Sequence, residues 1–526
     1  MVERRRGRIV SLLIALAVIM AGACTTGAPP RGGGLLIVDK SFDIKTADPH
    51  RELSVTGAIL FRALYSTLLT FEGGDESRPV PAVAASFTSS EDARRFTFNL
   101  RQAVMFSDGT PLTAADVVFS FNRVINLARA PSVLLSGVSV SAPNASTVVI
   151  RSTNPNPALP YIVTNPALAI VNSRVVKSNG GVDAPGAAKT DTAGAFMDLS
   201  SAGSGPYILD SFGTSEIRLT ANSRYWGPKA AFRRVLIRNM DAPTQLSFIP
   251  SGNDEIALDL SAAQAGTLAS SKSVHIHAAP GPELVFLFAN DNAKVSSVTP
   301  NLHFRNAVRS ALDYDGLVRM AGSGAIQAPG VVPSMLLGSL PSWIAPHRDL
   351  QRARSELALS GIKDPTVTLG FATDTTVGGL PMGTLAIVVK SELSDAGITV
   401  NLAGAPLASA TADYHAGRQQ MGLWSVTPTY ADPNYYLAFL PGHAFAFSAG
   451  WPAGSYPDLE SLGVQAGTTA DPPTRAELFQ HIQGQLNDEG PYFPLFQPGR
   501  VVVATTGIVA IDVNPSWSID LATVSG

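Results

Sequence analysis

Apolar and polar residues along this chain follow two patterns, one with the period of a β-strand and one with that of an α-helix. At residues 95–101 the two kinds alternate strictly, which predicts a half-buried strand. At residues 304–320 apolar side chains recur with helical spacing instead. Because both patterns occur along most of the chain, we expect a fold of the α/β class. Further strands are predicted at residues 35–38, 205–209, 216–219, 235–238, 274–276, 284–288, 493–496 and 500–503.

The order of the predicted elements changes after about residue 290, where longer helices and strands alternate. Helices predicted at residues 352–359 and 385–395 are each followed by a strand, at residues 366–371 and 398–402. This βαβ-like order is typical of a separate α/β lobe. A late helix is predicted at residues 472–488.

Two local signals come earlier in the chain. Thr113, with Asp116 three residues later, resembles a capping box, so a helix is predicted to begin there. Residues 178–195 contain few large apolar side chains and predict a loop.

The N-terminus has the pattern of an export signal. Three arginines at positions 4–6 precede an apolar run of about 15 residues, and small residues lead to Cys24, the only cysteine of the chain. This order resembles a bacterial lipobox, although Ala21 stands where Leu is commonest. Residues 1–23 are therefore predicted to be a signal peptide, Cys24 to be lipidated, and residues 24–34 to be a flexible tether.

The alternative is an uncleaved transmembrane anchor. The apolar run is shorter than the ~20 residues that a spanning helix needs, which favours the lipoprotein. Either reading places the rest of the chain outside the cytoplasm, in the cell envelope at a membrane surface. With Cys24 lipidated, the mature protein contains no disulfide.

The amino-acid composition limits the number of domains and the kinds of partner. The 526 residues include 45% hydrophobic and 15% charged side chains, which suffices for two or three domains with cores of their own. The net charge is −3 and the basic residues are dispersed, so no nucleic-acid-binding face is indicated.

Catalytic and metal-binding motifs are weak. There is no Gly-x-Ser-x-Gly elbow and no Walker A loop. Ser360 and Lys363 have the Ser-x-x-Lys spacing, but the companion motifs of that enzyme class are missing. His275 and His277 would share one face of a strand without a third ligand. His415 and His443, near the aromatic segment described next, are slightly better ligand candidates than His275 and His277. We predict that the protein is not an enzyme and has no metal site and no cofactor.

Residues 423–436 stand out because they combine one Trp, three Tyr, two Pro and one Asp. A proline-broken loop that leaves a strand at residues 421–424 can present aromatic faces and a carboxylate together. A cleft for an amphipathic solute requires both. A structural loop that plugs a domain edge is the alternative.

Taken together, these segments resemble the family 5 extracellular solute-binding proteins, the substrate-binding components of peptide, nickel and opine ABC importers. The strongest block runs from Pro81 to Arg123 and contains Phe-Ser-Asp-Gly-Thr-Pro-Leu-Thr followed by Asp-Val-Val-Phe-Ser-Phe. The similarity extends from about Leu35 to Val503. Further matching segments are Gly203–Tyr207, Asn222–Gly227, Phe304–Arg309 and Trp424–Pro433.

The resemblance implies a two-lobed periplasmic-binding-protein-like fold (type II, cluster C) with an α+β subdomain inserted in the first lobe. The signature block lies in that subdomain and is structural there. The predicted division is residues 35–69, 196–290 and 490–526 for lobe I, residues 70–195 for the inserted subdomain, and residues 291–489 for lobe II.

The resemblance also implies a ligand set. In peptide-binding members an Asp three residues before the acidic–Pro pair binds the peptide ammonium. Here that pair is Asp432–Pro433, and the matching position holds Thr429, which carries no charge. An ammonium buried without a carboxylate would forfeit about 2–5 kcal/mol. Either Asp432 or another acid replaces it, or the solute has no free amine. The predicted ligand-binding residues are Thr46, Asp48, Trp424, Thr429, Tyr430, Asp432 and Tyr435.

The predicted function is a lipid-anchored, monomeric receptor that captures a solute between two lobes and delivers it to an ABC permease with cytoplasmic ATPases. An oligopeptide or dipeptide is the leading solute, and a sugar, modified peptide, metal chelate or haem stays open. Hinge closure would depend on contacts that the solute makes with both lobes. A secreted cell-envelope hydrolase is the alternative from another class; a sensor or scaffold would need the same cleft.

Overall fold

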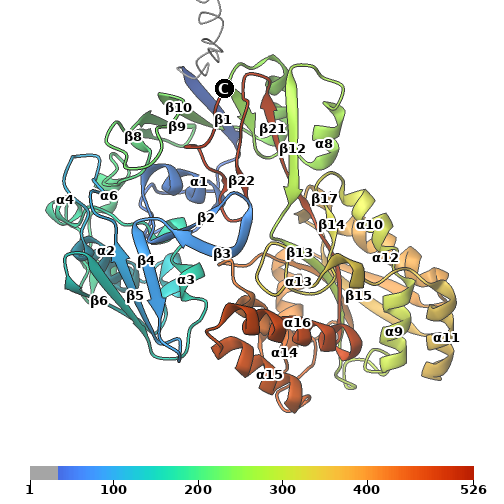
Figure 1. Cartoon of the computed structure of the whole chain (residues 1–526). Helices are drawn as coiled ribbons and strands as arrows, with labels where there is room; N and C mark the ends of the chain where they lie inside the picture. The colour runs from blue at the N-terminus through green and yellow to red at the C-terminus, as the bar shows by residue number, and fades with distance from the viewer. Residues whose placement is uncertain (1–33) are drawn as a thin grey trace, which may run out of the picture.

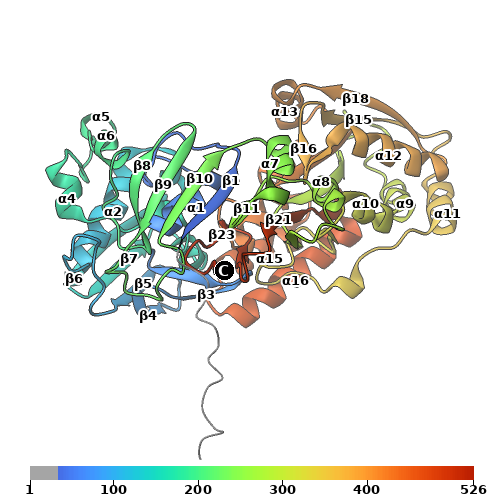
Figure 2. The same cartoon turned by 90° about the horizontal axis from the view of Figure 1, so that it is seen from above.

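The structure is a computed structural model, and it describes residues 34–526. The predicted signal peptide, Cys24 and residues 24–33 of the predicted tether lie outside the described residues. Two large sheets organise the molecule, and a smaller sheet lies beside the first (Figure 1). The view from above shows the inserted strands and helices at one end and helices α9–α13 at the other (Figure 2).

The first lobe is built on a seven-stranded sheet in the order β12-β21-β11-β1-β10-β9-β8. Its central strand β1 (Leu35–Lys40) pairs in parallel with β10 and β11, and its Leu36 and Val38 are fully buried. Helix α1 (Val55–Leu64) packs on this sheet through Ile59 and Leu60. The other elements are β8 (Tyr207–Phe212), β9 (Glu216–Ala221), β10 (Arg234–Asn239), β11 (Glu255–Ala257), β12 (Val274–Pro280), β21 (Gly499–Thr505), α7 (Ala242–Phe248) and α8 (Ala262–Thr267).

The inserted subdomain has a four-stranded antiparallel sheet, β4-β5-β7-β6, with helix α2 (Ala114–Leu127) packed on it. The predicted capping box at the start of α2 is confirmed, since the backbone N–H of Thr113 donates to Asp116 over 2.9 Å. The other elements are β2 (Leu69–Glu72), β3 (Asp75–Pro81), β4 (Ala84–Ser89), β5 (Arg95–Leu100), β6 (Val138–Asn144), β7 (Thr147–Ser152), α3 (Leu159–Ile162), α4 (Ser173–Ser178), α5 (Ala187–Thr190) and α6 (Gly194–Met197).

The prediction of a loop over residues 178–195 is wrong in part, because α5 lies inside it and α6 begins within it. Each of these helices has four residues and buries one side chain, Ala187 in α5 and Met197 in α6. A single buried residue per helix leaves no apolar periodicity that a sequence pattern could reveal.

The second lobe is built on a six-stranded sheet, β14-β20-β13-β19-β15-β18, packed against α9, α10 and α12. The helix predicted at residues 304–320 is two helices, because Asp313 caps the second one by accepting from the N–H of Gly316. The elements are β13 (Leu284–Ala289), α9 (Leu302–Ala311), α10 (Tyr314–Ala321), β14 (Ile326–Gln327), α11 (Leu350–Ser360), β15 (Thr366–Ala372), α12 (Met382–Asp395), β18 (Thr399–Ala405), α13 (Leu407–His415), β19 (Met421–Val426), α14 (Ala444–Ser448), α15 (Pro457–Thr468), α16 (Pro472–Glu489) and β20 (Tyr492–Gln497).

The chain passes between the two large sheets at β12–β13 and again at β20–β21. Strands β13 and β20 therefore belong to the second sheet, although the sequence placed both in lobe I. The reason is that each strand is buried at every position, so its apolar run resembles that of a central strand in either lobe. The remaining limits of the predicted domains stay predictions.

Two glycines of the Gly203–Tyr207 segment lie against the C-terminal end of α1. The N–H of Gly205 donates to the carbonyl of Leu64 over 3.0 Å. A Cβ on Gly205 would lie 2.5 Å from the carbonyl oxygen of Ala63, and one on Gly203 would lie 2.0 Å from that of Leu64. Both positions therefore exclude any side chain.

We expect Gly205→Ala to lower the free energy of unfolding by about 1–3 kcal/mol, because backbone atoms that cannot rotate away would have to move. Gly266→Ala in α8 is the matched control, since nothing lies within 4 Å of its Cβ position. That substitution should be neutral or stabilise the helix by up to about 1 kcal/mol. Urea unfolding of both variants measures the difference; equal midpoints would contradict the packing argument.

Candidate functional site

A cavity of about 290 Å³ lies where the two lobes and the inserted subdomain meet. The first lobe contributes residues around the start of α1 together with Arg500 of β21. The inserted subdomain contributes Glu76 and residues 165–167, and the second lobe contributes residues 427–431. The full lining is Glu52, Leu53, Ser54, Val55, Ala58, Phe61, Glu76, Asn165, Pro166, Ala167, Pro282, Thr427, Pro428, Thr429, Tyr430, Ala431, Arg500, Pro515 and Ser516.

The second-lobe wall is the segment that follows β19. Thr427 and Thr429 are exposed, and Tyr430 packs its ring against the core of the inserted subdomain. The side-chain amide of Asn165 donates to the carbonyl of Thr429 over 3.2 Å. Contacts therefore already reach across the cavity from the inserted subdomain to the second lobe.

A buried ion pair holds the end of this wall. Asp432 is fully buried and accepts hydrogen bonds from both terminal nitrogens of Arg475, one of them over 2.8 Å. Arg475 lies in α16 and also donates to Asn434. The carboxylate of Asp432 thus contacts a protein guanidinium and does not line the cavity.

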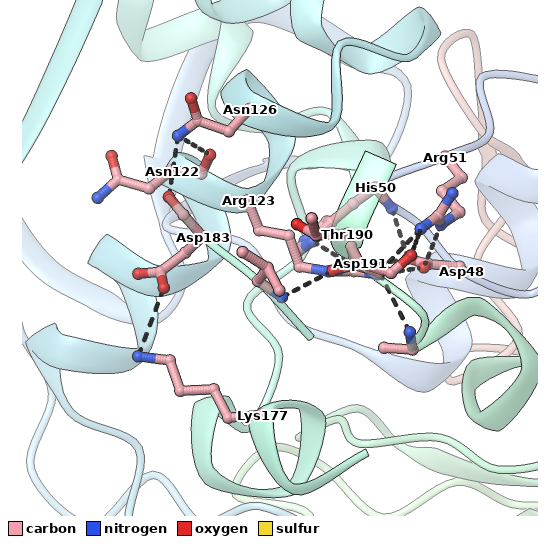
Figure 3. Close-up of polar contacts among 12 residues, drawn as sticks. Asp48, His50, Arg51, Asn122, Arg123, Asn126, Lys177, Asp183, Thr190 and Asp191 are labelled. Carbon is pink, nitrogen blue, oxygen red and sulfur yellow. Dashed lines mark hydrogen bonds and ion pairs between the residues drawn. The ribbon is translucent and has the colours of Figure 1, made fainter. Parts of the chain in front are cut away.

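Asp48 of the first lobe is likewise held by a buried arginine (Figure 3). It is fully buried, and Arg123 of α2 donates to it from both terminal nitrogens, over 2.9 and 2.6 Å. Arg123 also donates to Asp191, and Arg51 contacts both carboxylates. Burial disfavours the charged carboxylate, but the hydrogen bonds and the charge of Arg123, together with the contribution of His50, outweigh it and lower the pKa of Asp48. This network ties lobe I to the inserted subdomain.

His50 completes the network and is uncharged at neutral pH. Its Nδ1 lies 3.1 Å from a terminal nitrogen of Arg123, and its Nε2 lies 2.9 Å from the carbonyl oxygen of Ala169. Burial, together with the charge of Arg123, lowers the pKa of His50 to about 4.

The three remaining predicted site residues also lie outside the lining. Thr46 donates its hydroxyl to Asp198 over 2.6 Å. The indole N–H of Trp424 donates to Gln419 over 2.9 Å, and its ring lies 4.7 Å from that of Tyr414. Tyr435 packs edge-on against Tyr430 at 5.9 Å. Of the predicted ligand residues, the structure brings Thr429 and Tyr430 to the cavity.

Sequence reasoning missed Glu76 and Arg500. Glu76 is 1% exposed and accepts from the N–H of Ser516 over 2.8 Å. Arg500 donates from one terminal nitrogen to the carbonyl of Asn514 and to the hydroxyl of Ser518. Glu76 and Arg500 are far apart in the sequence, so no local pattern indicates that they are close. Both contact the C-terminal turn at residues 514–518, which brings them together.

Burial is the largest influence on the pKa values of the acidic side chains near Arg500. It raises the pKa of Glu76 to about 7, against the opposing effects of hydrogen bonds from Ser516 and the charge of Arg500. Burial likewise raises the pKa of Glu283, next to the lining residue Pro282. Burial also lowers the pKa of Arg500, against the charges of Glu76 and Glu283, yet a guanidinium stays protonated at neutral pH.

No cluster of three or more His, Cys, Asp or Glu side chains that could hold a metal ion occurs in residues 34–526. His275 and His277 occupy alternate positions of β12, at the edge of the first sheet. No helix within the same residues is both long and apolar enough to cross a bilayer.

Comparison with known proteins identifies the family. Residues 78–446 match the sequence model of the bacterial extracellular solute-binding proteins, family 5. The chain belongs to this family. A probable D,D-dipeptide-binding periplasmic protein of Escherichia coli K12 is 26% identical over 501 residues, which cover 91% of this chain and 92% of that protein. A glutathione-binding protein of Escherichia coli O1:K1 is 24% identical and covers 93% of each chain.

Solved structures confirm the two-lobed fold of this family 5 protein. HbpA2 of Haemophilus parasuis superposes with a TM-score of 0.82 at 21% identity and covers 94% of this chain and 99% of that one. The ABC transporter-associated periplasmic binding protein DppA of Helicobacter pylori, solved in complex with the peptide STSA, gives a TM-score of 0.66 at 20% identity and covers 94% of this chain and 99% of that one. The relatives and the family are described as solute-binding proteins.

We expect Glu76→Gln to remove a pH dependence of stability. A carboxyl group with pKa about 4.5 in the unfolded chain and about 7 in the fold leaves stability unaffected below pH 4.5, where both states are protonated. As the pH rises to about 7 the unfolded state ionises first, and the folded state loses up to about 3 kcal/mol.

The difference in unfolding free energy between variant and wild type should therefore shift in favour of Glu76→Gln from pH 4.5 to 7.5 and then level off. Taking the difference cancels the other titrating groups. Urea unfolding across this range measures it, and a difference that does not change with pH would contradict the burial argument.

Proposed function

We propose that this protein is the lipid-anchored receptor of an ABC importer and binds a short, peptide-like solute in the cavity between its lobes. The observation that carries the proposal is the composition of the cavity wall, which comes from both lobes and the inserted subdomain. A solute that contacts all three segments would favour their approach, and only such differential contacts can drive closure. An ABC permease would then recognise the closed form.

The relatives support a peptide-like solute. One is described as D,D-dipeptide-binding and another as glutathione-binding. The cavity volume of about 290 Å³ lies at the lower end of small-molecule sites, which favours a solute of dipeptide size.

Within this proposal Thr429 and Tyr430 contact the solute directly. Asp48 and Asp432 act by holding the segments that line the cavity, since each is fully buried against an arginine. Thr46, Trp424 and Tyr435 support the same segments from behind. Thr429 has no charge to offer a peptide ammonium, and burial raises the pKa of Glu76 to about 7, so the ammonium would then be bound by a backbone carbonyl of the cavity wall.

The direct test is mass spectrometry of the solute released from the purified protein by mild denaturation. We expect short peptides or peptide-like acids. A sugar or a haem in their place would contradict the proposal while leaving the family assignment intact.

We expect Tyr430→Ala to weaken binding of the released solute about 30-fold, since loss of an aromatic contact in a binding site costs about 2 kcal/mol. Tyr456→Ala is the matched control, because Tyr456 is half-buried against Trp451 and does not line the cavity. Calorimetric titration of both variants gives the affinities. An unchanged affinity for Tyr430→Ala would remove that residue from the site.

The anchor is tested separately. Cys24→Ala should release the protein from the membrane fraction, because the thiol that would carry the lipid is gone. Thr25→Ala is the control and should stay with the membranes. Retention of the cysteine variant would favour an uncleaved N-terminal helix.

A further inference from the structure

The guanidinium of Arg500 is only partly used by the protein. One terminal nitrogen donates to Asn514 and Ser518, over 3.2 and 2.8 Å. In the part of the chain that the structure describes, its Nε and second terminal nitrogen have no hydrogen-bond partner, and neither is among the buried unpaired atoms. Because Arg500 lines the cavity, this second edge is open to it.

No carboxylate of residues 34–526 lies within 4.0 Å of this guanidinium. Glu76 and Glu283 are near enough to influence it, yet burial favours the neutral form of both. Other half-buried arginines near the first sheet differ, since Arg62 pairs with Asp520 and Arg238 with Asp39. A cation in a cavity wall with no carboxylate at salt-bridge distance favours an anion among its ligands.

The free edge has a specific shape. The Nε and one terminal nitrogen of a guanidinium form a planar fork that matches the two oxygens of a carboxylate. The bonds to Asn514 and Ser518 orient this fork, because they use the opposite end of the group. Preorganisation of this kind lowers the entropy cost of binding.

We infer that Arg500 binds a carboxylate of the solute through its free edge, so that this protein selects peptide-like solutes with a free carboxyl terminus over their neutral amides. The inference rests on the proposed function. It adds that the solute carries a negative charge and that Arg500 binds this charge.

The experiment compares two libraries of dipeptides with identical side chains, one with free carboxyl termini and one amidated. Native mass spectrometry measures how much of each the protein captures. Wild type should prefer the free acids about 30-fold or more, the range for a desolvated charge pair. Arg500→Gln should bring the two libraries to equal capture, and Arg500→Lys should retain part of the preference as a point charge.

The ratio of captured free acids to captured amides shows whether Arg500 binds the solute carboxylate or only stabilises the C-terminal turn. If Arg500 only held the turn, Arg500→Gln would weaken both libraries alike and leave their ratio unchanged, which would overturn the inference. Arg62→Gln is the matched control, since Arg62 holds the same C-terminal segment through Asp520 and does not line this cavity. It should preserve the wild-type ratio.

Equal capture of both libraries by wild type would overturn the inference and leave the proposed function in place. Capture of neither library would contradict the proposed peptide-like solute and the inference with it. The two failures are therefore distinguishable by whether wild type binds either library at all.

Discussion

Two buried ion pairs determine where the cavity lies. Asp48 with Arg123 ties the turn after β1 to the inserted subdomain, and Asp432 with Arg475 ties the segment after β19 to α16. A buried charge left without its partner is strongly destabilising, so neither segment is free to move away from its arginine. The cavity walls are thereby held at two points, one in each lobe, and exposed residues such as Thr429 face the cavity between them.

This arrangement separates the residues that build the site from those that touch its contents. The aromatic segment at residues 423–436 combines both, with Trp424 packed behind and Tyr430 in front. The charged groups are divided similarly. Carboxylates that pair with arginines lie behind the walls, whereas Glu76 and Arg500 lie in them without pairing to each other. Among the described residues, Arg500 is thus a cavity-lining cation without a carboxylate at salt-bridge distance.

The sequence predicted the fold better than the site. Strands such as β5 and the capped start of α2 follow from local pattern, because neighbours in the chain decide them. Family resemblance supplied the two-lobed arrangement, which periodicity alone did not. The site depends on contacts between residues hundreds of positions apart, such as Glu76 with Ser516. The sequence around Asp48 and Asp432 likewise gives no sign of the buried arginine that pairs with each.

The last segment of the chain has a consequence for biogenesis. Ser516 donates to Glu76, Ser518 accepts from Arg500, and Trp517 stacks on Phe71 of the inserted subdomain at 6.0 Å. Both large sheets are complete before this segment begins, since their final strand ends at Thr505. The part of the cavity wall that Pro515 and Ser516 form therefore exists only once the last residues of the chain have packed onto the finished sheets.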